Sequence, residues 1–123
     1  MIAADTSVWS DFFKARPSRV ARRLEELLAE EHVVLPMPVL FELLSGPGLD
    51  RAGAKLIERM PQLELRDLFW ERTAEMRKKI LSRGLKARSL DCLIAQNCID
   101  HGVPLLAADS DYRHFVRYGL KLA

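Results

Sequence analysis

Short apolar segments alternate with longer helical segments along the whole chain, and this alternation limits the folds that are open to it. The apolar segments predict strands at residues 2–4, 32–35, 62–66 and 103–107, with a short edge strand at 120–122. The segments between them predict a helix after Asp5 and further helices at 18–31, 38–45, 50–60, 67–83 and 90–100. Strands separated by helices pair in parallel through βαβ crossovers. We therefore expect an α/β fold of three layers, with helices on both faces of a short central parallel sheet.

Helix-capping residues mark where several of these helices begin. Asp5, Thr6 and Ser7 suit the start of the first helix, Ser18 the second, and Ser89 the helix over 90–100. With 123 residues, 49% of them hydrophobic, the chain is long enough for one domain with a hydrophobic core and too short for two. The prediction is a single domain over residues 1–123.

The apolar runs and the two cysteines favour a cytoplasmic protein. No run approaches the roughly 18 residues of a membrane span, and no basic leader precedes an apolar stretch. We therefore expect no membrane partner. Cys92 and Cys98 lie six residues apart on one expected helix, which separates them by about 240° of rotation and about 9 Å of rise. This geometry argues against a disulfide, and reduced thiols that pack in the core suit a cytosolic setting.

Four acidic residues lie in segments that are otherwise apolar or turning: Asp5, Glu42, Asp91 and Asp109. Burying an ionised carboxylate costs several kcal/mol unless it is paired or binds a metal. A shared divalent cation would satisfy all four carboxylates, and an oxygen-only ligand set favours Mg²⁺ or Mn²⁺ over zinc. Asp5 and Asp109 each follow a strand, so they share the sheet edge where parallel sheets bind ligands. Asp91 lies near a helix N-terminus that can face the same crevice.

Each acid also has an ordinary structural interpretation. Asp5 could cap the first helix, Glu42 could face solvent on an amphipathic helix, and Asp91 could interact with a helix dipole. Asp109 and Asp111 could be turn or capping residues. The metal-site hypothesis is preferred because one site accounts for all four positions at once.

A basic segment lies directly before Asp91. The formal net charge is only +2, from 19 basic and 17 acidic residues, but residues 76–90 contain six basic residues and no acid. A solvated helix face is the ordinary interpretation of such a run, and its position beside a candidate metal site favours phosphate binding. The basic residues are Arg77, Lys78, Lys79, Arg83, Lys86 and Arg88.

Other catalytic classes lack the residues they need. The histidines at positions 32, 101 and 114 are scattered, and surface or capping roles suit them. No nucleophile elbow, phosphate-binding loop, dinucleotide fingerprint or C-x-x-C pair is present, which argues against serine hydrolase, NTPase, Rossmann and zinc-finger functions.

The order of four short blocks carries a resemblance to a known family. The blocks are a strand followed by Asp5-Thr6-Ser7, then Val39-Leu40-Phe41-Glu42-Leu43-Leu44-Ser45-Gly46, then Leu90-Asp91-Cys92-Leu93-Ile94-Ala95, then Leu105-Leu106-Ala107-Ala108-Asp109-Ser110-Asp111-Tyr112. In this order the chain resembles the PIN domain family, specifically the small VapC-type toxin ribonucleases of toxin–antitoxin pairs. The last block departs from the usual threonine and D-x-D-F, which leaves Asp111 as an alternative to Asp109 for the fourth ligand.

The resemblance implies an endoribonuclease that depends on Mg²⁺ or Mn²⁺ and leaves 5′-phosphate and 3′-hydroxyl ends; transfer RNA is a common family target. Asp5, Asp91 and Asp109 would hold the cation, and Glu42 would bind it or activate the attacking water. Thr6 or Ser7 would hydrogen-bond a ligand carboxylate or water. From charge placement alone, we expect the RNA backbone to be attracted by Arg83, Lys86 and Arg88.

The resemblance also implies a cognate antitoxin and pairing of the toxin as a homodimer or in a hetero-oligomer with the antitoxin. Candidate residues for an antitoxin groove are Trp9, Phe12, Phe13 and the apolar side of 49–60, although each could be ordinary core. The alternative functions are a PIN-fold nucleic-acid-binding module and a nuclease that acts on DNA. A receiver-like domain or an aspartyl-nucleophile phosphatase fits poorly because a single acid, Asp5, follows the first strand.

Overall fold

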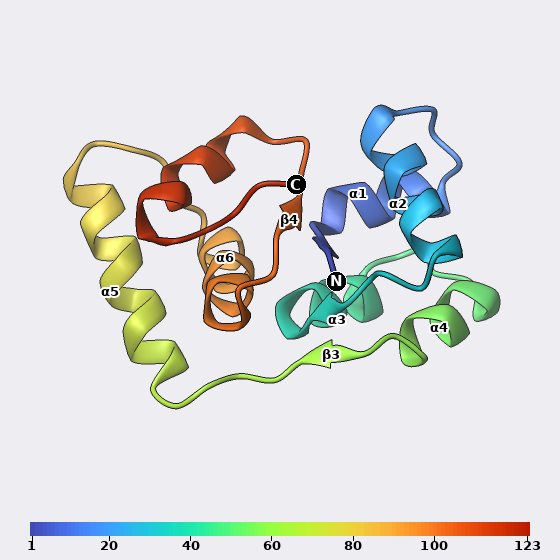
Figure 1. The fold of residues 1–123 in the computed structure, drawn as a ribbon, viewed down its shortest axis with the longest axis horizontal. Coiled ribbons are helices and arrows are strands. Elements are labelled where there is room, and N and C mark those ends of the chain that lie inside the picture. Colours follow the sequence, from blue (N-terminus) through green and yellow to red (C-terminus); the bar gives the residue numbers. More distant parts are fainter.

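A computed structural model describes all 123 residues, and its elements follow the predicted alternation (Figure 1). In chain order these are β1 (Ala3–Ala4), α1 (Thr6–Phe13), α2 (Arg19–Ala29), β2 (Leu35–Pro36), α3 (Met37–Ser45), α4 (Arg51–Glu58), β3 (Gln62–Leu63), α5 (Phe69–Ser82), α6 (Ser89–His101), β4 (Leu105–Leu106) and the 3₁₀ helix η1 (Ser110–Tyr118).

The strands form short parallel pairs that join into one series. β1 pairs with β4 and β2 pairs with β3, both in parallel. Single parallel bridges, Ile2 with Val33 and Leu105 with Leu122, connect the pairs in the order β3, β2, β1, β4 and the C-terminal segment. The order reverses between β1 and β4, so the carboxyl ends of these two strands flank the point where open parallel sheets bind ligands.

The strands are shorter than predicted, and prolines lie at or beside three of them. Pro36 lies within β2, while Pro61 and Pro104 directly precede β3 and β4. A proline has no N–H to donate, although its carbonyl still accepts. The carbonyl of Pro104 accepts a bond from Ala3 and that of Pro61 accepts one from Leu35, at 2.9 and 2.8 Å. Each of the four strands pairs over two residues.

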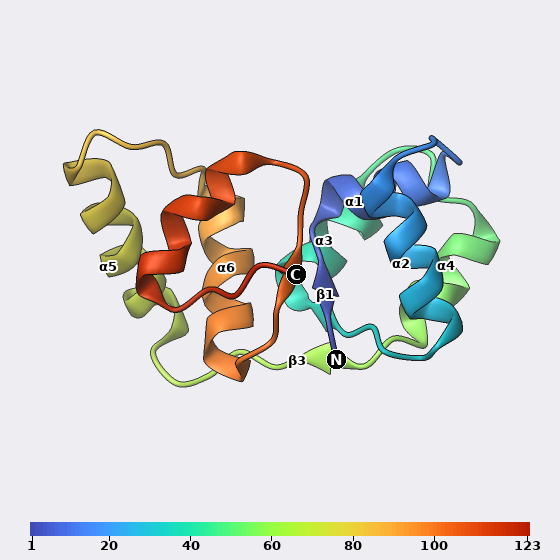
Figure 2. The same cartoon turned by 45° about the horizontal axis from the view of Figure 1, so that its top comes forward.

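Helices cover both sides of the sheet, as predicted. Figure 2 shows β1 between α5 and α6 on one side and α1, α2 and α4 on the other. Both termini lie beside the sheet in the two views. α1 packs against α2 and α5 against α6, while α3 contacts both α1 and α6. The helices that carry the candidate acids therefore meet at the centre of the molecule.

Trp9 corrects the predicted antitoxin groove. Its side chain is completely buried and stacks on Phe13, with ring centroids 5.7 Å apart. Phe12 and Phe13 are only half-buried and pack against the edge of the same core. Trp9 is a core residue because the α1 face that carries it is covered by neighbouring elements, whereas its two aromatic neighbours remain partly accessible.

Two helix starts also differ from prediction. Asp5 and Ser18 cap α1 and α2 as expected, but α6 begins one residue early, with Arg88 at the N-cap and Ser89 already helical. α5 starts at Phe69 because Leu68 adopts a left-handed conformation with φ of 58°, which a helical residue cannot have. η1 was not predicted, and it delivers the chain to Leu122, whose bridge to Leu105 is consistent with the short edge strand.

The two cysteines agree with the prediction of reduced thiols packed in the core. Cys92 and Cys98 are free and buried, and burial raises their pKa values to about 11 and about 12. The thiols therefore remain protonated at neutral pH and act as core residues. None of the helices is both long enough and apolar enough to cross a bilayer.

Candidate active site

Asp5 lies at the end of β1 and is almost fully buried, with 7% of its surface exposed. Its N–H donates to the carbonyl of Leu106 in β4, which fixes it at the junction of the two central strands. Its Oδ2 accepts bonds from the Ser7 hydroxyl and backbone N–H at 2.7 and 3.4 Å, so Asp5 also caps α1. The capping interpretation is therefore correct, and it leaves Oδ1 free for other partners.

A buried tyrosine joins Asp5 to Asp91. The Tyr112 hydroxyl donates to Asp5 Oδ1 at 2.6 Å and lies 3.2 Å from Asp91 Oδ1. Asp91 is half-buried in the first turn of α6. Two carboxylates that are 86 positions apart in the chain are thus brought to one hydroxyl group, at the point where the strand order reverses.

The electrostatics of this pair are unfavourable without a cation. Burial and then the negative charge of Asp5 raise the pKa of Asp91, while the Tyr112 hydrogen bond and the Arg88 charge act in the opposite direction. The Asp109 charge adds a further rise. Burial and the two carboxylates raise the pKa of Tyr112 as well, so its hydroxyl keeps its proton and remains a donor.

Glu42 is tied to the same region through a threonine. The Thr6 hydroxyl donates to Glu42 Oε1 at 2.6 Å, which joins the first residue of α1 to the middle of α3. Glu42 is half-buried and lines a hollow of about 190 Å³ together with Thr6, Phe13 and the loop after α3. Because Thr6 directly follows Asp5, this contact places Glu42 beside the carboxylate pair without direct contact to it.

The two candidates for the fourth ligand lie at the start of η1. Asp109 is exposed, and its Oδ1 accepts a bond from the Asp111 N–H at 2.8 Å, so it caps η1. Asp111 is half-buried in the first turn. The negative charge of Asp109 adds to the rise in the pKa of Asp91, so Asp109 lies close enough to influence it.

The donors suit a hard divalent cation in their chemistry, although they are not arranged around a common centre. No three carboxylate, histidine or cysteine side chains are grouped as a metal would require. Instead, neutral hydroxyls of Thr6, Ser7 and Tyr112 occupy carboxylate oxygens. Acidic side chains in one region repel one another, and hydroxyl donors to their oxygens reduce that repulsion. Asp5 and Asp91 would hold the cation, because these two already share one partner.

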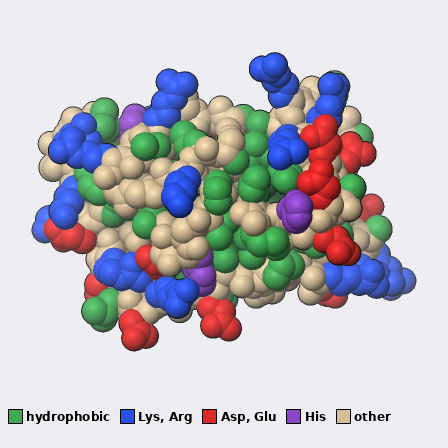
Figure 3. Space-filling model, in the orientation of Figure 1, with side chains coloured by type: hydrophobic (Ala, Val, Ile, Leu, Met, Phe, Trp, Pro, Cys, Tyr) green, Lys and Arg blue, Asp and Glu red, His purple; other side chains and the backbone are tan.

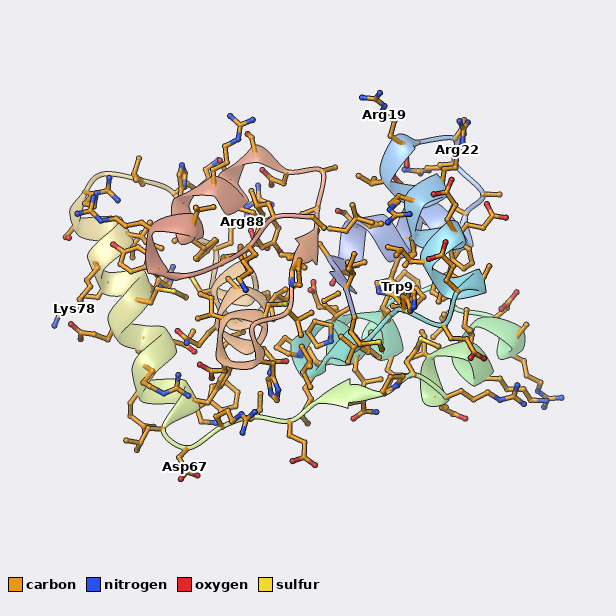
Figure 4. All side chains as sticks on the ribbon, viewed as in Figure 1. Trp9, Arg19, Arg22, Asp67, Lys78 and Arg88 are labelled. Atoms are coloured by element: carbon orange, nitrogen blue, oxygen red, sulfur yellow. The ribbon has the colours of Figure 1, made fainter.

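The basic residues differ in how closely they approach the carboxylates. Arg88 at the N-cap of α6 is exposed but near enough to lower the pKa of Asp91. Lys78 points outward from α5 in Figure 4. Arg83 and Lys86 are exposed in the loop between α5 and α6. Arg77 donates to the Ala87 carbonyl at 2.9 Å and so supports this loop, a structural role the sequence analysis did not predict.

Two residues of the site were missed by the sequence analysis. One is Tyr112, which was quoted only as the end of the last block. The other is Asn97, which is completely buried: its Oδ1 accepts from the Met37 N–H at 3.0 Å and its Nδ2 donates to the Leu63 carbonyl at 3.2 Å. Asn97 thereby ties α6, which carries Asp91, to the start of α3, which carries Glu42. The sequence signal for this role was the presence of Asn97, a polar residue, within the otherwise apolar run of α6.

The fold and the site define a class: an α/β protein with a parallel sheet, whose carboxyl edge gathers acidic side chains suited to a divalent cation. The chain belongs to the PIN domain family, whose family model matches residues 2–118.

The chain is similar in sequence to named relatives and in structure to solved proteins. VapC ribonuclease Mb1587 of Mycobacterium bovis and ribonuclease VapC11 of Mycobacterium tuberculosis are each 34% identical over 119 residues, covering 91% of this chain and 89% of theirs. The VapBC2 structure from Rickettsia felis, bound to a DNA fragment from its promoter, aligns over 100% of this chain and 98% of the solved chain with a TM-score of 0.73 at 20% identity. FitAcB from Neisseria gonorrhoeae aligns over 99% of this chain and 96% of the solved chain with a TM-score of 0.70 at 19% identity.

Proposed function

We propose that this protein is the endoribonuclease toxin of a toxin–antitoxin pair and that it hydrolyses RNA phosphodiester bonds with Mg²⁺ or Mn²⁺. The observation that carries the proposal is the pairing of Asp5 with Asp91 at the carboxyl edge of the sheet, in a chain 34% identical to proteins named as ribonucleases. Holding a half-buried carboxylate beside a buried one is costly, and perturbed acidic groups of this kind cluster at functional sites.

The cation, when bound, lowers the pKa of a water molecule and neutralises the charge that builds on the scissile phosphate. Asp5, Asp91 and Asp109 would hold it, with Glu42 either binding it or activating the attacking water. Glu42 Oε1 already accepts the Thr6 hydroxyl, which orients the carboxylate and leaves Oε2 to accept a proton from the attacking water. Ser7 fixes Asp5 in the same way. In-line attack of this water on phosphorus would break the P–O3′ bond, leaving a 5′-phosphate and a 3′-oxygen that takes up a proton to become the 3′-hydroxyl.

The RNA backbone would approach from the side of the loop between α5 and α6. Arg88 is the basic residue whose charge lowers the pKa of Asp91, and Arg83 and Lys86 extend the positive charge along the exposed loop. Figure 3 shows Lys and Arg side chains scattered over this half of the molecule as separate groups. Scattered cations attract phosphates of any sequence, so they supply affinity and leave the choice of RNA to other contacts.

Two surfaces suit protein partners. The hollow beside Glu42, which also includes Phe13 and Leu49, is the proposed antitoxin groove, now without the buried Trp9. A separate apolar hollow of about 360 Å³ includes the exposed side chains of Phe41 and Trp70. Large exposed aromatic side chains commonly mark interfaces, so this face is proposed for a second copy of the chain.

The test is cleavage of total cellular RNA by the purified protein, freed of antitoxin, with Mg²⁺, Mn²⁺ or EDTA. Glu42→Gln keeps the side-chain shape and the Thr6 acceptor while removing the proton-accepting carboxylate, so it should lose at least 100-fold in rate, as expected for a lost general base. The ends are then mapped by ligation that requires a 5′-phosphate. Cleavage of single-stranded DNA in preference to RNA would favour the DNA-directed alternative, and no cleavage of either would favour the binding module.

A further inference from the structure

Tyr112 is the one neutral group that contacts both central carboxylates. It is 1% exposed, it comes from η1, and its ring packs against Phe115 with centroids 5.9 Å apart. Its hydroxyl lies 2.6 Å from Asp5 Oδ1 and 3.2 Å from Asp91 Oδ1. The ring packing alone would be met by a phenylalanine, so the hydroxyl is the part that needs an explanation.

One hydroxyl carries one proton, and it can donate to only one carboxylate at a time. The shorter contact identifies Asp5 as the main acceptor. Asp91 also lies within hydrogen-bond distance of the hydroxyl, but its contact is longer and therefore weaker. Asp5 has further donors on its other oxygen, from Ser7, whereas Asp91 has no second side-chain donor. The hydroxyl therefore sits where two like charges converge.

We propose that the Tyr112 hydroxyl is a positioning group that holds Asp5 and Asp91 together while no cation is bound, and that it competes with the cation for them. The proposal rests on the cation site of the proposed function. A bound cation balances both charges directly, so the hydroxyl contributes less to the loaded protein than to the metal-free one. By linkage, any group that stabilises the metal-free state more than the loaded state weakens cation binding.

The test is Mn²⁺ binding to Tyr112→Phe measured by titration calorimetry, with Tyr118→Phe as the matched control. Tyr118 is half-buried in the same helix η1, and its substitution removes the same hydroxyl away from the carboxylates. We expect Tyr112→Phe to bind Mn²⁺ about 3- to 10-fold more tightly than the wild type. A change of this size corresponds to losing part of the free energy of a charge-assisted hydrogen bond. Tyr118→Phe should match the wild type.

Thermal melts separate this role from simple support of the fold. A purely structural hydroxyl would lower the melting temperature of Tyr112→Phe equally in EDTA and in Mn²⁺. The proposal predicts a larger loss in EDTA than in saturating Mn²⁺. Equal losses, or Mn²⁺ binding by Tyr112→Phe that is unchanged or weaker, would overturn it.

Two further outcomes keep the test decisive. If Tyr112→Phe fails to fold, Tyr118→Phe serves instead, because it leaves Tyr112 as the single tyrosine. Its near-ultraviolet difference spectrum is recorded on adding Mg²⁺. A blue shift supports loss of the hydrogen bond from Tyr112 to the carboxylate, and no shift overturns the proposal. If the wild type binds no Mn²⁺, the cation site of the proposed function fails, and this inference fails with it. Wild-type binding without tighter binding by Tyr112→Phe overturns only the inference.

Discussion

Asp91→Asn should stabilise the protein in the absence of metal while it removes a cation ligand. The Asp5 and Asp91 Oδ1 atoms lie 2.6 and 3.2 Å from one hydroxyl oxygen, so they are at most about 5.8 Å apart. Two unit charges at that distance repel by about 3 kcal/mol at an effective dielectric constant of about 20. Because Asp91 is only half-buried, solvent screening reduces the expected gain to about 1 kcal/mol.

The assay is thermal unfolding in EDTA over a series of pH values. About 1 kcal/mol corresponds to about 4 °C in Tm for a chain of this length. Burial and the Asp5 charge raise the pKa of Asp91, so its ionisation destabilises the folded protein. That cost is absent below the unfolded pKa of about 4 and fully present above the folded pKa, so the advantage of Asp91→Asn should appear as pH rises through this window.

The control is Asp109→Asn, because Asp109 is exposed and asparagine caps a helix as well as aspartate does. It should remain within about 0.5 kcal/mol of the wild type. Added Mg²⁺ should raise the Tm of the wild type and leave that of Asp91→Asn unchanged. An Asp91→Asn protein that melts at or below the wild-type temperature in EDTA at neutral pH would refute the argument that the two carboxylates repel.

Three other predictions address the scaffold and the substrate. Asn97→Ala leaves a buried N–H and a buried carbonyl without partners and should lose about 2 to 4 kcal/mol in urea unfolding; a loss under 1 kcal/mol would contradict its proposed role. Arg88→Ala should weaken RNA binding several-fold at low salt. Arg19 points outward from α2 in Figure 4, so Arg19→Ala should leave binding unchanged, and equal effects of the two substitutions would count against the proposed approach of RNA. Partial burial alone would raise the pKa of Asp100, but hydrogen bonds from Arg72 and Gln96 outweigh burial and lower it. The stability that ionised Asp100 contributes is therefore present above its unfolded pKa and lost as pH falls through its folded pKa. Arg72→Met should lose about 1 to 2 kcal/mol in urea unfolding at neutral pH and little in acid, and a loss that did not depend on pH would contradict this.

Local chemistry made much of the fold predictable. The strand before Asp5 and the capping residues after it predicted both the end of β1 and the start of α1, because capping depends on neighbours in the chain. The alternation of strands and helices predicted parallel pairing for the same kind of reason, since a crossover needs a helix between strands. The adjacency of Asp5 and Asp91 then followed from where β1 ends and where α6 begins.

Features that depend on distant packing were not predictable. The Tyr112 hydroxyl meets a carboxylate 107 positions away, and no local pattern reports such a contact. Helical periodicity showed that Trp9 belongs to an apolar face, but it could not show that this face is covered. The left-handed Leu68, which delays α5, is equally hidden, because leucine has no preference for that conformation. The four carboxylates and the basic segment remain a predicted site.

The most direct test of the central claim is Mn²⁺ binding and RNA cleavage measured on the same samples of wild-type protein and Asp5→Asn. Asparagine keeps one acceptor oxygen for Ser7, and its amide nitrogen can donate to the Tyr112 hydroxyl, which can then donate to Asp91, so the variant should still fold while the pair loses one negative charge. The account predicts Mn²⁺ binding and metal-dependent cleavage by the wild type, and loss of both by Asp5→Asn. Cleavage that persists in Asp5→Asn, or in EDTA, would contradict it.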